Sequence, residues 1–366
     1  MWISLVRRAV LASVTLALLS PASLIAQHYQ RTDLTADSSA VSPSAANIDP
    51  NLVNAWGLSR ASGSPWWVSD NGTGLSTLYN ATGMPQSLIV KIPTPDGTGT
   101  SAPTGTVFNP TSQFLVASGA KAIFLFVTED GTISGWNPTV NPTNAVLLVN
   151  RAGKAIYKGC AIAQTADGPR FYATNFQSGR VDVFFGNFKK LPTNINAFRL
   201  PGLSVDYAPF NIQNVGGNLV VTFAHRAPGS KDEDHGPGLG FVGVFDTTGR
   251  LLQRLQHGPW FNAPWGVALA PGDFGTFSHR VLIGNFGDGT IHAFNMITGK
   301  HEGMMLDASS GNALVIDGLW AISFGGDAAN NGPATSLFFT AGPNDEADGL
   351  FGQLAAVAFE QRGNSE

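Results

Sequence analysis

The sequence predicts an all-β fold, a six-bladed β-propeller with four-stranded blades, on two observations. One phrase recurs about every 50 residues: a small residue or proline, an aromatic, a small or polar residue, then an aliphatic. Between the copies, β-branched and aromatic runs end in turns rich in Asn, Asp and Gly, as in successive short hairpins. The clear copies lie at residues 55–58, 208–212, 263–268 and 318–322, and weaker ones lie at 103–107 and 159–163.

Composition supports one closed domain, for which we expect the boundaries 27–366. A chain of 366 residues could hold two ordinary domains. Six copies of one unit favour a single ring instead, because no copy can bury its apolar faces alone. The net charge is −4 and no basic run occurs, so nucleic acid is not an expected partner.

The first 26 residues read as a secretory signal peptide. Arg7 and Arg8 precede an apolar run at 9–19, and small residues follow, with cleavage possible after Ala22 or Ala26. The run is too short to span a bilayer, although a retained N-terminal anchor is the alternative. We therefore expect a secreted or periplasmic protein, monomeric and without a membrane span after cleavage.

Each copy of the phrase is expected to open the innermost strand of a blade. Trp56, Trp265 and Trp320 occupy its aromatic position and should pack blade against blade rather than stack on a ligand. Cys160, the only cysteine, occupies the same position and should be a buried, inert thiol. The sixth blade has no outer strand left at the C-terminus, so residues 29–34 are predicted to complete it and close the ring.

Four further phrases carry a resemblance to a known family. They lie at residues 49–58, 236–242, 262–268 and 342–352. Together they resemble exported bacterial hypothetical proteins, some with a PEP-CTERM sorting tail, that are expected to be six-bladed propellers. The resemblance covers essentially the whole chain after residue 26 and implies no catalytic residue. This chain differs from the tailed members because residues 361–366 hold no apolar anchor.

A more distant similarity concerns Pro264-Trp265-Gly266, which resembles the phrase of NHL-repeat propellers. Those proteins are mostly binding scaffolds, and their relatives include calcium-dependent lactonases and esterases.

Oxygen ligands at the hairpin tops are the candidate metal site. Asp70, Asn175 and Asn285 occupy similar places in different blades, and so do Asn71 and Glu129. A ring would gather such residues on one face, where hard oxygen ligands suit calcium. The alternative is that they bond to their own turns, as Asn and Asp commonly do.

Two acidic loops that interrupt the repeat, at 224–238 and 341–349, add Asp234, Asp345 and Asp348 to these tentative ligands. Longer loops on a compact scaffold often carry function. Simple solvated loops are the alternative.

Three functions are consistent with these observations. Motifs for a serine-hydrolase elbow, a zinc protease, a phosphate-binding loop and a paired-cysteine site are all absent. The leading hypothesis is therefore a secreted binding or scaffold protein whose ligand is a small molecule, a glycan or an envelope protein. The alternatives are a calcium-dependent lactonase or esterase with the metal in the central funnel, and a cell-envelope interaction module. No cofactor is certain, and calcium is the one candidate.

Overall fold

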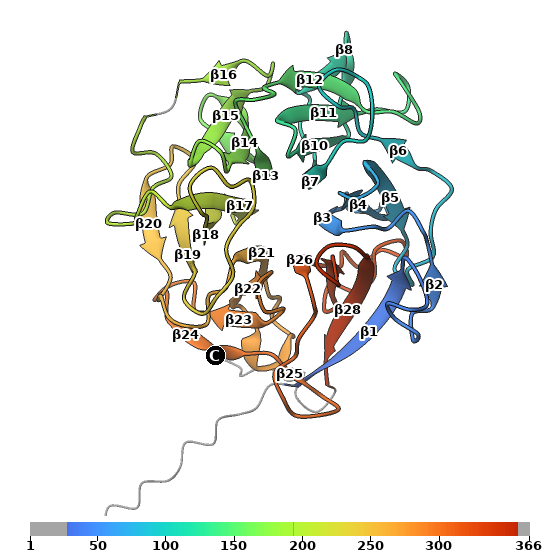
Figure 1. Ribbon diagram of the computed structural model, residues 1–366, viewed down its shortest axis with the longest axis vertical. Coiled ribbons are helices and arrows are strands. Elements are labelled where there is room, and N and C mark those ends of the chain that lie inside the picture. The colour runs from blue at the N-terminus through green and yellow to red at the C-terminus, as the bar shows by residue number, and fades with distance from the viewer. Residues whose placement is uncertain (1–27, 193, 358–366) are drawn as a thin grey trace, which may run out of the picture.

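The computed structural model describes residues 28–192 and 194–357, which form six small sheets around a central axis (Figure 1). Within each blade the neighbouring strands are antiparallel, and the first strand lies nearest the axis. The predicted six-bladed β-propeller is therefore confirmed. The predicted signal peptide, residues 1–26, lies outside the described residues.

The strand bounds follow the chain around the ring. Blade 1 holds β3 (Ala55–Ser59), β4 (Trp66–Asp70), β5 (Leu75–Tyr79) and β6 (Val90–Lys91). Blade 2 holds β7 (Pro103–Phe108), β10 (Phe124–Thr128), β11 (Thr132–Trp136) and β12 (Val146–Asn150). Blade 3 holds β13 (Tyr157–Thr165), β14 (Gly168–Asn175), β15 (Arg180–Phe185) and β16 (Lys190–Leu191). Blade 4 holds β17 (Tyr207–Val215), β18 (Asn218–His225), β19 (Gly240–Phe245) and β20 (Leu251–Arg254). Blade 5 holds β21 (Pro264–Leu269), β22 (Val281–Asn285), β23 (Ile291–Phe294) and β24 (His301–Met304). Blade 6 holds β26 (Leu319–Phe324), β27 (Leu337–Ala341), β28 (Leu350–Ala356) and β1 (His28–Ala36).

A few short elements lie outside the four-stranded blades. The strands β2 (Asn47–Ile48) and β25 (Leu306–Asp307) both pair with β1 in the sheet of blade 6. The strands β8 (Leu115–Ala117) and β9 (Ala120–Lys121) form a separate ribbon, and η1 (Gly275–Phe277) is a 3-10 turn. No helix in the described part of the chain is long and apolar enough to cross a membrane.

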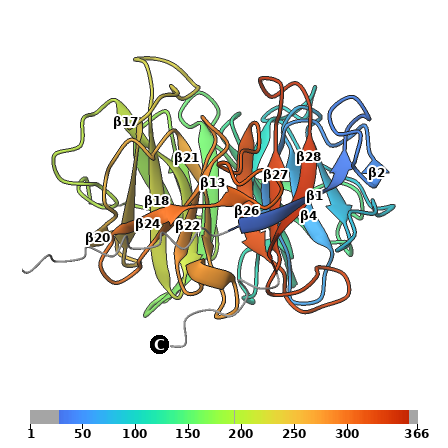
Figure 2. The same ribbon diagram turned by 90° about the horizontal axis from the view of Figure 1, so that it is seen from below.

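The N-terminal strand closes the last blade, as predicted for residues 29–34. β1 runs antiparallel to β28, from the pair Tyr29↔Ala356 to the pair Ala36↔Leu350 (Figure 2). The Tyr29 ring is fully buried against Phe274 of blade 5, with ring centroids 4.8 Å apart. A strand from the start of the chain thus covers an edge that the end of the chain would leave open.

Glycine in the repeated phrase lets neighbouring inner strands approach closely. A Cβ atom at Gly57 would lie 2.3 Å from the carbonyl oxygen of Thr104 in the next blade, and one at Gly266 would lie 2.8 Å from that of Trp320. Gly105 meets Gly159 and Cys160 in the same way. The phrase therefore requires a small residue at this position, because the backbones of neighbouring blades are in contact there.

The aromatic position of the phrase fills the centre of the ring. The Trp56 and Trp320 rings stack with centroids 3.6 Å apart, and Phe286 stacks on the same Trp320 at 3.9 Å. Trp265 meets Trp56 at 6.4 Å with its ring turned by 69°. These contacts confirm the predicted packing between blades, and Cys160 is buried as expected.

Candidate functional site

The three hairpin-top candidates end the second strands of their blades and bond within those blades. The Asn175 amide donates to the Lys154 carbonyl at 3.2 Å, and its oxygen accepts from the Ser178 N–H at 3.2 Å. The Asn285 amide donates to the Trp260 carbonyl at 2.9 Å, and its oxygen accepts from the Asn262 N–H at 3.2 Å. Both amides therefore tie the hairpin to the segment that enters the blade.

Asp70 occupies the matching position in blade 1. Its Oδ2 accepts from the Thr77 N–H at 3.0 Å, and its side chain is fully buried. Burial raises the pKa of Asp70 well above its usual range, since its hydrogen bonds with Thr77 lower the pKa less. The structure thus places Asp70 inside blade 1, where it organises the β4–β5 hairpin.

The candidates in the acidic loops make different contacts. Asp234 lies 2.7 Å from the Nδ1 of His225, Asp348 accepts from Asn344, and Asp345 is exposed. Across residues 28–192 and 194–357, no three His, Cys, Asp or Glu side chains are arranged to hold a metal ion. The calcium site at these six residues stays a prediction.

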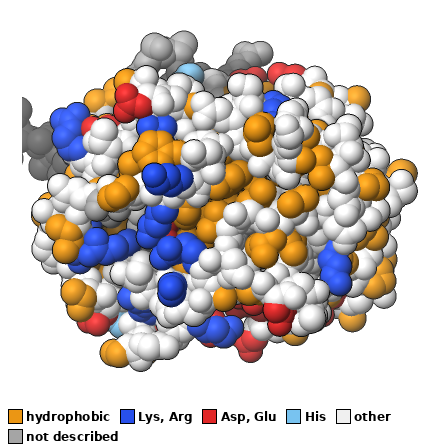
Figure 3. Space-filling model, turned by 90° about the horizontal axis from the view of Figure 1, so that it is seen from above, with side chains coloured by type: hydrophobic (Ala, Val, Ile, Leu, Met, Phe, Trp, Pro, Cys, Tyr) orange, Lys and Arg blue, Asp and Glu red, His pale blue; other side chains and the backbone are white. Residues whose placement is uncertain are grey.

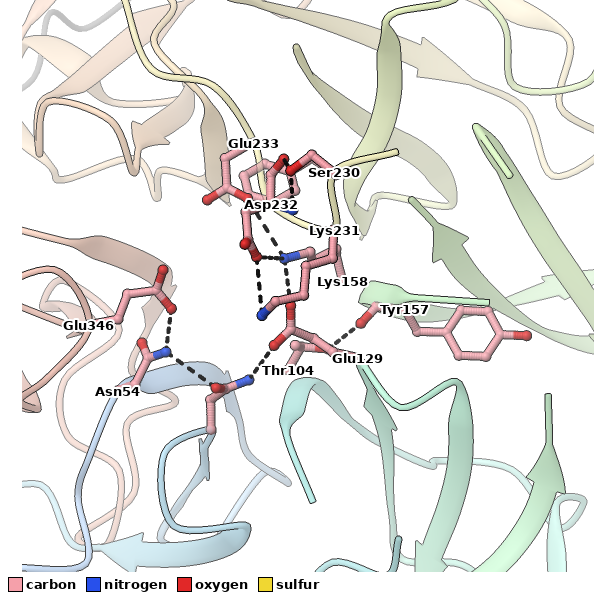
Figure 4. A network of polar contacts seen from close by, with 12 residues as sticks. Asn54, Thr104, Glu129, Tyr157, Lys158, Ser230, Lys231, Asp232, Glu233 and Glu346 are labelled. Atoms are coloured by element: carbon pink, nitrogen blue, oxygen red, sulfur yellow. Dashed lines mark hydrogen bonds and ion pairs between the residues drawn. The ribbon is translucent and has the colours of Figure 1, made fainter. Parts of the chain in front are cut away.

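Another group of polar side chains does converge on the axis, and we call it the axial cluster. Five of the blades supply it, at one end of the ring (Figure 4). Lys158 lies on β13, Glu129 follows β10, and Asn71 follows β4. The loops that interrupt the repeat, between β18 and β19 and between β27 and β28, supply Glu233 and Glu346. The members are Asn54, Asn71, Glu129, Lys158, Asp232, Glu233 and Glu346.

Lys158 is the buried cation of the axial cluster, with a side chain only 1% exposed. Its Nζ lies 2.7 Å from Glu129 Oε1, 3.7 Å from Glu233 Oε2 and 3.9 Å from Asp232 Oδ1. The ammonium also lies over the Trp56 ring, 4.9 Å from its centroid. Burial alone would lower the pKa of Lys158, but Glu129 and Glu233 raise it above its ordinary value. The side chain is therefore a permanent positive charge.

A chain of amides joins Glu129 to Glu346 on the other side of the axis. The Asn71 amide donates to Glu129 Oε2 at 3.2 Å, and the Asn54 amide donates both to Asn71 Oδ1 at 3.4 Å and to Glu346 Oε2. The indole N–H of Trp320 donates to Asn54 Oδ1 at 2.8 Å, which fixes this amide. Burial would raise the pKa of Glu129, but Lys158 holds it below its usual value.

The two loop carboxyls are less well satisfied. The Glu233 side chain is 3% exposed, and its Oε2 accepts no hydrogen bond in the described part of the chain. Burial raises the pKa of Glu233. Burial, and next the charge of Glu233, also raises the pKa of Glu346 to about 7. The cluster therefore holds one carboxyl oxygen without a donor, on Glu233, and one carboxyl, that of Glu346, that changes charge near neutral pH.

The donor set of the axial cluster does not fit calcium as it stands. Calcium needs several oxygen ligands around one open position. Here the Lys158 ammonium already lies among the carboxylates, and it would repel a divalent ion. The same carboxylates suit a ligand that brings hydrogen-bond donors, because their remaining lone pairs are acceptors.

Sequence reasoning named only part of this cluster. Glu129 and Asn71 appeared among the hairpin tops, and the acidic loops were singled out as wholes. Glu233 and Glu346 lie in those loops, whereas Lys158 and Asn54 were missed. One signal was available: Lys158 is a charged residue directly before the buried phrase at 159–163.

Comparison with known proteins places the chain among uncharacterised viral relatives. It is 30% identical over 320 residues to "Uncharacterized protein R648" of Acanthamoeba polyphaga mimivirus, covering 85% of this chain and 76% of that protein. It is 31% identical over 324 residues to "Uncharacterized protein L690" of the same virus, covering 85% and 82%. This chain belongs to their family. No family model matches the sequence, and the resemblance to exported bacterial proteins stays a prediction.

Solved structures share the fold. A streptogramin B lyase superposes with a TM-score of 0.52 at 12% identity, covering 90% of this chain and 97% of that one. The soluble aldose sugar dehydrogenase of Escherichia coli also gives 0.52 at 12% identity, covering 89% and 99%. At this identity the likeness concerns the propeller alone, so function has to be argued from the site.

Proposed function

We propose that this protein is an exported β-propeller that binds a small ligand at the axial cluster, and that the ligand carries an ammonium group or hydroxyl donors. The convergence of five blades on one point supports a built site. Both loops that interrupt the repeat contribute a side chain to this cluster, Glu233 and Glu346, which supports a role for these loops beyond connecting strands. Export rests on the signal peptide that the sequence predicts for residues 1–26.

The observation that carries this proposal is the unsatisfied carboxylate oxygen of Glu233. A buried carboxylate without a hydrogen-bond donor costs on the order of a few kcal/mol. Lys158 offsets part of this cost from 3.7 Å, but it donates to Glu129 at 2.7 Å instead. A donor from a ligand would satisfy Glu233 and balance the excess of carboxyls over cations in the cluster.

The test compares two carboxyl-to-amide variants across a defined set of probes. The probes are primary diamines, amino acids and neutral sugars, and the readouts are melting temperature and calorimetric titration. A compound that binds should raise the melting temperature of the wild type and lose about tenfold or more in affinity in Glu233→Gln, because the charged acceptor is gone. Asp345→Asn is the control, since Asp345 is an exposed carboxyl of the other acidic loop. Equal affinity in both variants would place the binding elsewhere and contradict the proposal.

A second candidate is an enzyme that uses Glu346 as a general acid or base. A carboxyl with a pKa of about 7, in the same cluster as a buried ammonium, suits proton transfer near neutral pH. This candidate includes the hydrolase of esters or lactones that the sequence suggested. Turnover of aryl esters and lactones, with calcium and with a chelator, tests it. A rate that Glu346→Gln abolishes would support it, and no turnover with either addition would exclude this reaction class.

A further inference from the structure

A separate feature lies on the outer rim of the ring, away from the axial cluster. Apart from Lys158 of the axial cluster, residues 151–199 hold seven of the 21 Lys and Arg residues of this acidic chain, with only Asp167 and Asp182 as acids. These residues form blade 3 and its junctions with blades 2 and 4. Figure 3 shows a concentration of Lys and Arg side chains on the side face formed by the outer edges of the blades.

Asp182 is the centre of this basic region. It lies on β15 and is buried, with its Oδ2 3.4 Å from Arg151 Nε and its Oδ1 2.5 Å from Lys190 Nζ. Arg180 precedes it by two positions on the same strand, so the two side chains point to the same face. The backbone of Lys154 lies close to Asp182, because the Asn175 amide donates both to the Lys154 carbonyl and to Asp182 at 3.2 Å.

We call this group the basic seam, because it lies where blade 2 meets blade 3. Lys154, Lys189 and Lys190 are exposed, while Arg151 and Arg180 are half-buried. In the described residues, Lys154, Arg180 and Lys189 take part in no ion pair. Asp182 pairs with Arg151 and Lys190, so the positive charge of the other three residues is left for a partner. The basic seam consists of Arg151, Lys154, Arg180, Lys189 and Lys190.

We propose that the basic seam binds an acidic polysaccharide through its carboxylate or sulfate groups. Exposed lysines and arginines are donors that match such anions. Gln177 and Ser178, in the turn that leads to Arg180 on β15, are exposed neutral polar groups of the kind that contact sugar hydroxyls, and Arg226 of blade 4 donates to the Gln177 carbonyl in the same turn.

Two other anionic partners match the surface less well. Among the described residues, the large apolar side chains that are exposed include no Phe, Tyr or Trp, so base stacking by single-stranded nucleic acid has no platform. Between Arg151 and Lys154 lie only Ala152 and Gly153, which offer no bulky apolar group for insertion into a lipid surface.

The experiment measures binding of residues 27–366 to immobilised dextran sulfate and alginate, with neutral dextran as the blank. A 30-base-pair DNA duplex and phosphatidylserine vesicles are run alongside. We expect both acidic polysaccharides to bind at low salt, to weaken as salt rises, and to be preferred over duplex and vesicles.

Matched charge reversals locate the surface. Lys154→Glu with Lys189→Glu should weaken polysaccharide binding by about tenfold or more. Lys91→Glu with Lys300→Glu changes the net charge equally, at exposed lysines of blades 1 and 5, and should change binding less than about twofold. The corresponding Gln pairs repeat the comparison if a Glu pair does not fold.

Three results would overturn the proposal. One is an equal loss in the two matched pairs, which indicates binding to net charge alone. Another is tighter binding to duplex or vesicles than to polysaccharide. The third is the absence of binding to either polysaccharide by protein that melts normally.

Discussion

Lys158 is the buried cation at the centre of the axial cluster. A buried ammonium is costly unless opposite charges and acceptors surround it. Glu129 lies 2.7 Å away, Glu233 lies 3.7 Å away, and the face of the Trp56 ring lies beneath. Together these groups keep the lysine charged in a place that is closed to water. Burial and the charge of Glu233, which Lys158 does not fully offset, then raise the pKa of Glu346.

The pKa of Glu346 predicts how stability depends on pH. Its value of about 7 in the folded protein exceeds the ordinary 4.5, so the folded state binds more protons than the unfolded state between these values. The contribution of Glu346 to the free energy of unfolding should therefore fall as pH rises from about 4.5 to 7. Glu346→Gln should lack this fall and be more stable than the wild type at pH 8, by an amount on the order of 2 kcal/mol.

Urea unfolding at several values from pH 5 to pH 8 measures this difference. Asp345→Asn, at an exposed neighbour, should follow the wild type throughout. Parallel curves for Glu346→Gln and the wild type would show that the pKa of Glu346 is not raised.

The inner strand of each blade explains the repeated phrase. Its aromatic residue packs on the axis, as Trp56 does on Trp320. Its small residue allows the backbone of the next blade to approach, as Gly266 does for the Trp320 carbonyl. The phrase is therefore a packing unit, and its periodicity reflects contact between neighbouring blades.

Gly266→Ala should destabilise the protein by about 1–3 kcal/mol. The new Cβ would lie 2.8 Å from the Trp320 carbonyl oxygen, so the backbone of blade 5 or blade 6 has to move. Gly63→Ala is the matched control, because a Cβ there meets nothing within 4 Å. Chemical unfolding of both variants measures the difference. Equal stability of the two would mean that the inner strands have room that the structure does not show.

The ring as a whole depends on a strand from the other end of the chain. β1 covers the open edge of β28 and buries Tyr29 and Leu34. Because every blade packs on two neighbours, an incomplete sixth blade weakens its contacts with blades 1 and 5. Closure of this kind makes the stability of the ring a collective property.

A truncated chain that starts at Asp37 should melt well below a chain that starts at His28. It loses the buried side chains of Tyr29 and Leu34, worth about 2 kcal/mol each, together with the hydrogen bonds of a full strand. Calorimetry of the two chains measures the change. If both chains melt at the same temperature, β1 does not contribute to closure.

Much of this fold could be predicted because its signals lie in short stretches of sequence. The recurring phrase and the hairpin turns each lie within a few residues of sequence, and strand periodicity converts them directly into blades. The same regularity showed that the sixth copy lacks an outer strand, and it predicted that residues 29–34 supply this strand. The hairpin-top candidates Asp70, Asn175 and Asn285 followed from it too, but their hydrogen bonds fall within their own blades.

The sequence by itself therefore determined the blade, its repetition and its closure, because each depends on short-range pattern. Only the tertiary structure decided which polar residues meet. Asn54, Glu129, Lys158, Glu233 and Glu346 are spread over nearly 300 positions, yet the ring brings them to one end of its axis. The charged members then interact in a buried environment. There, the groups that are close in space determine each pKa and decide which oxygen lacks a hydrogen-bond donor.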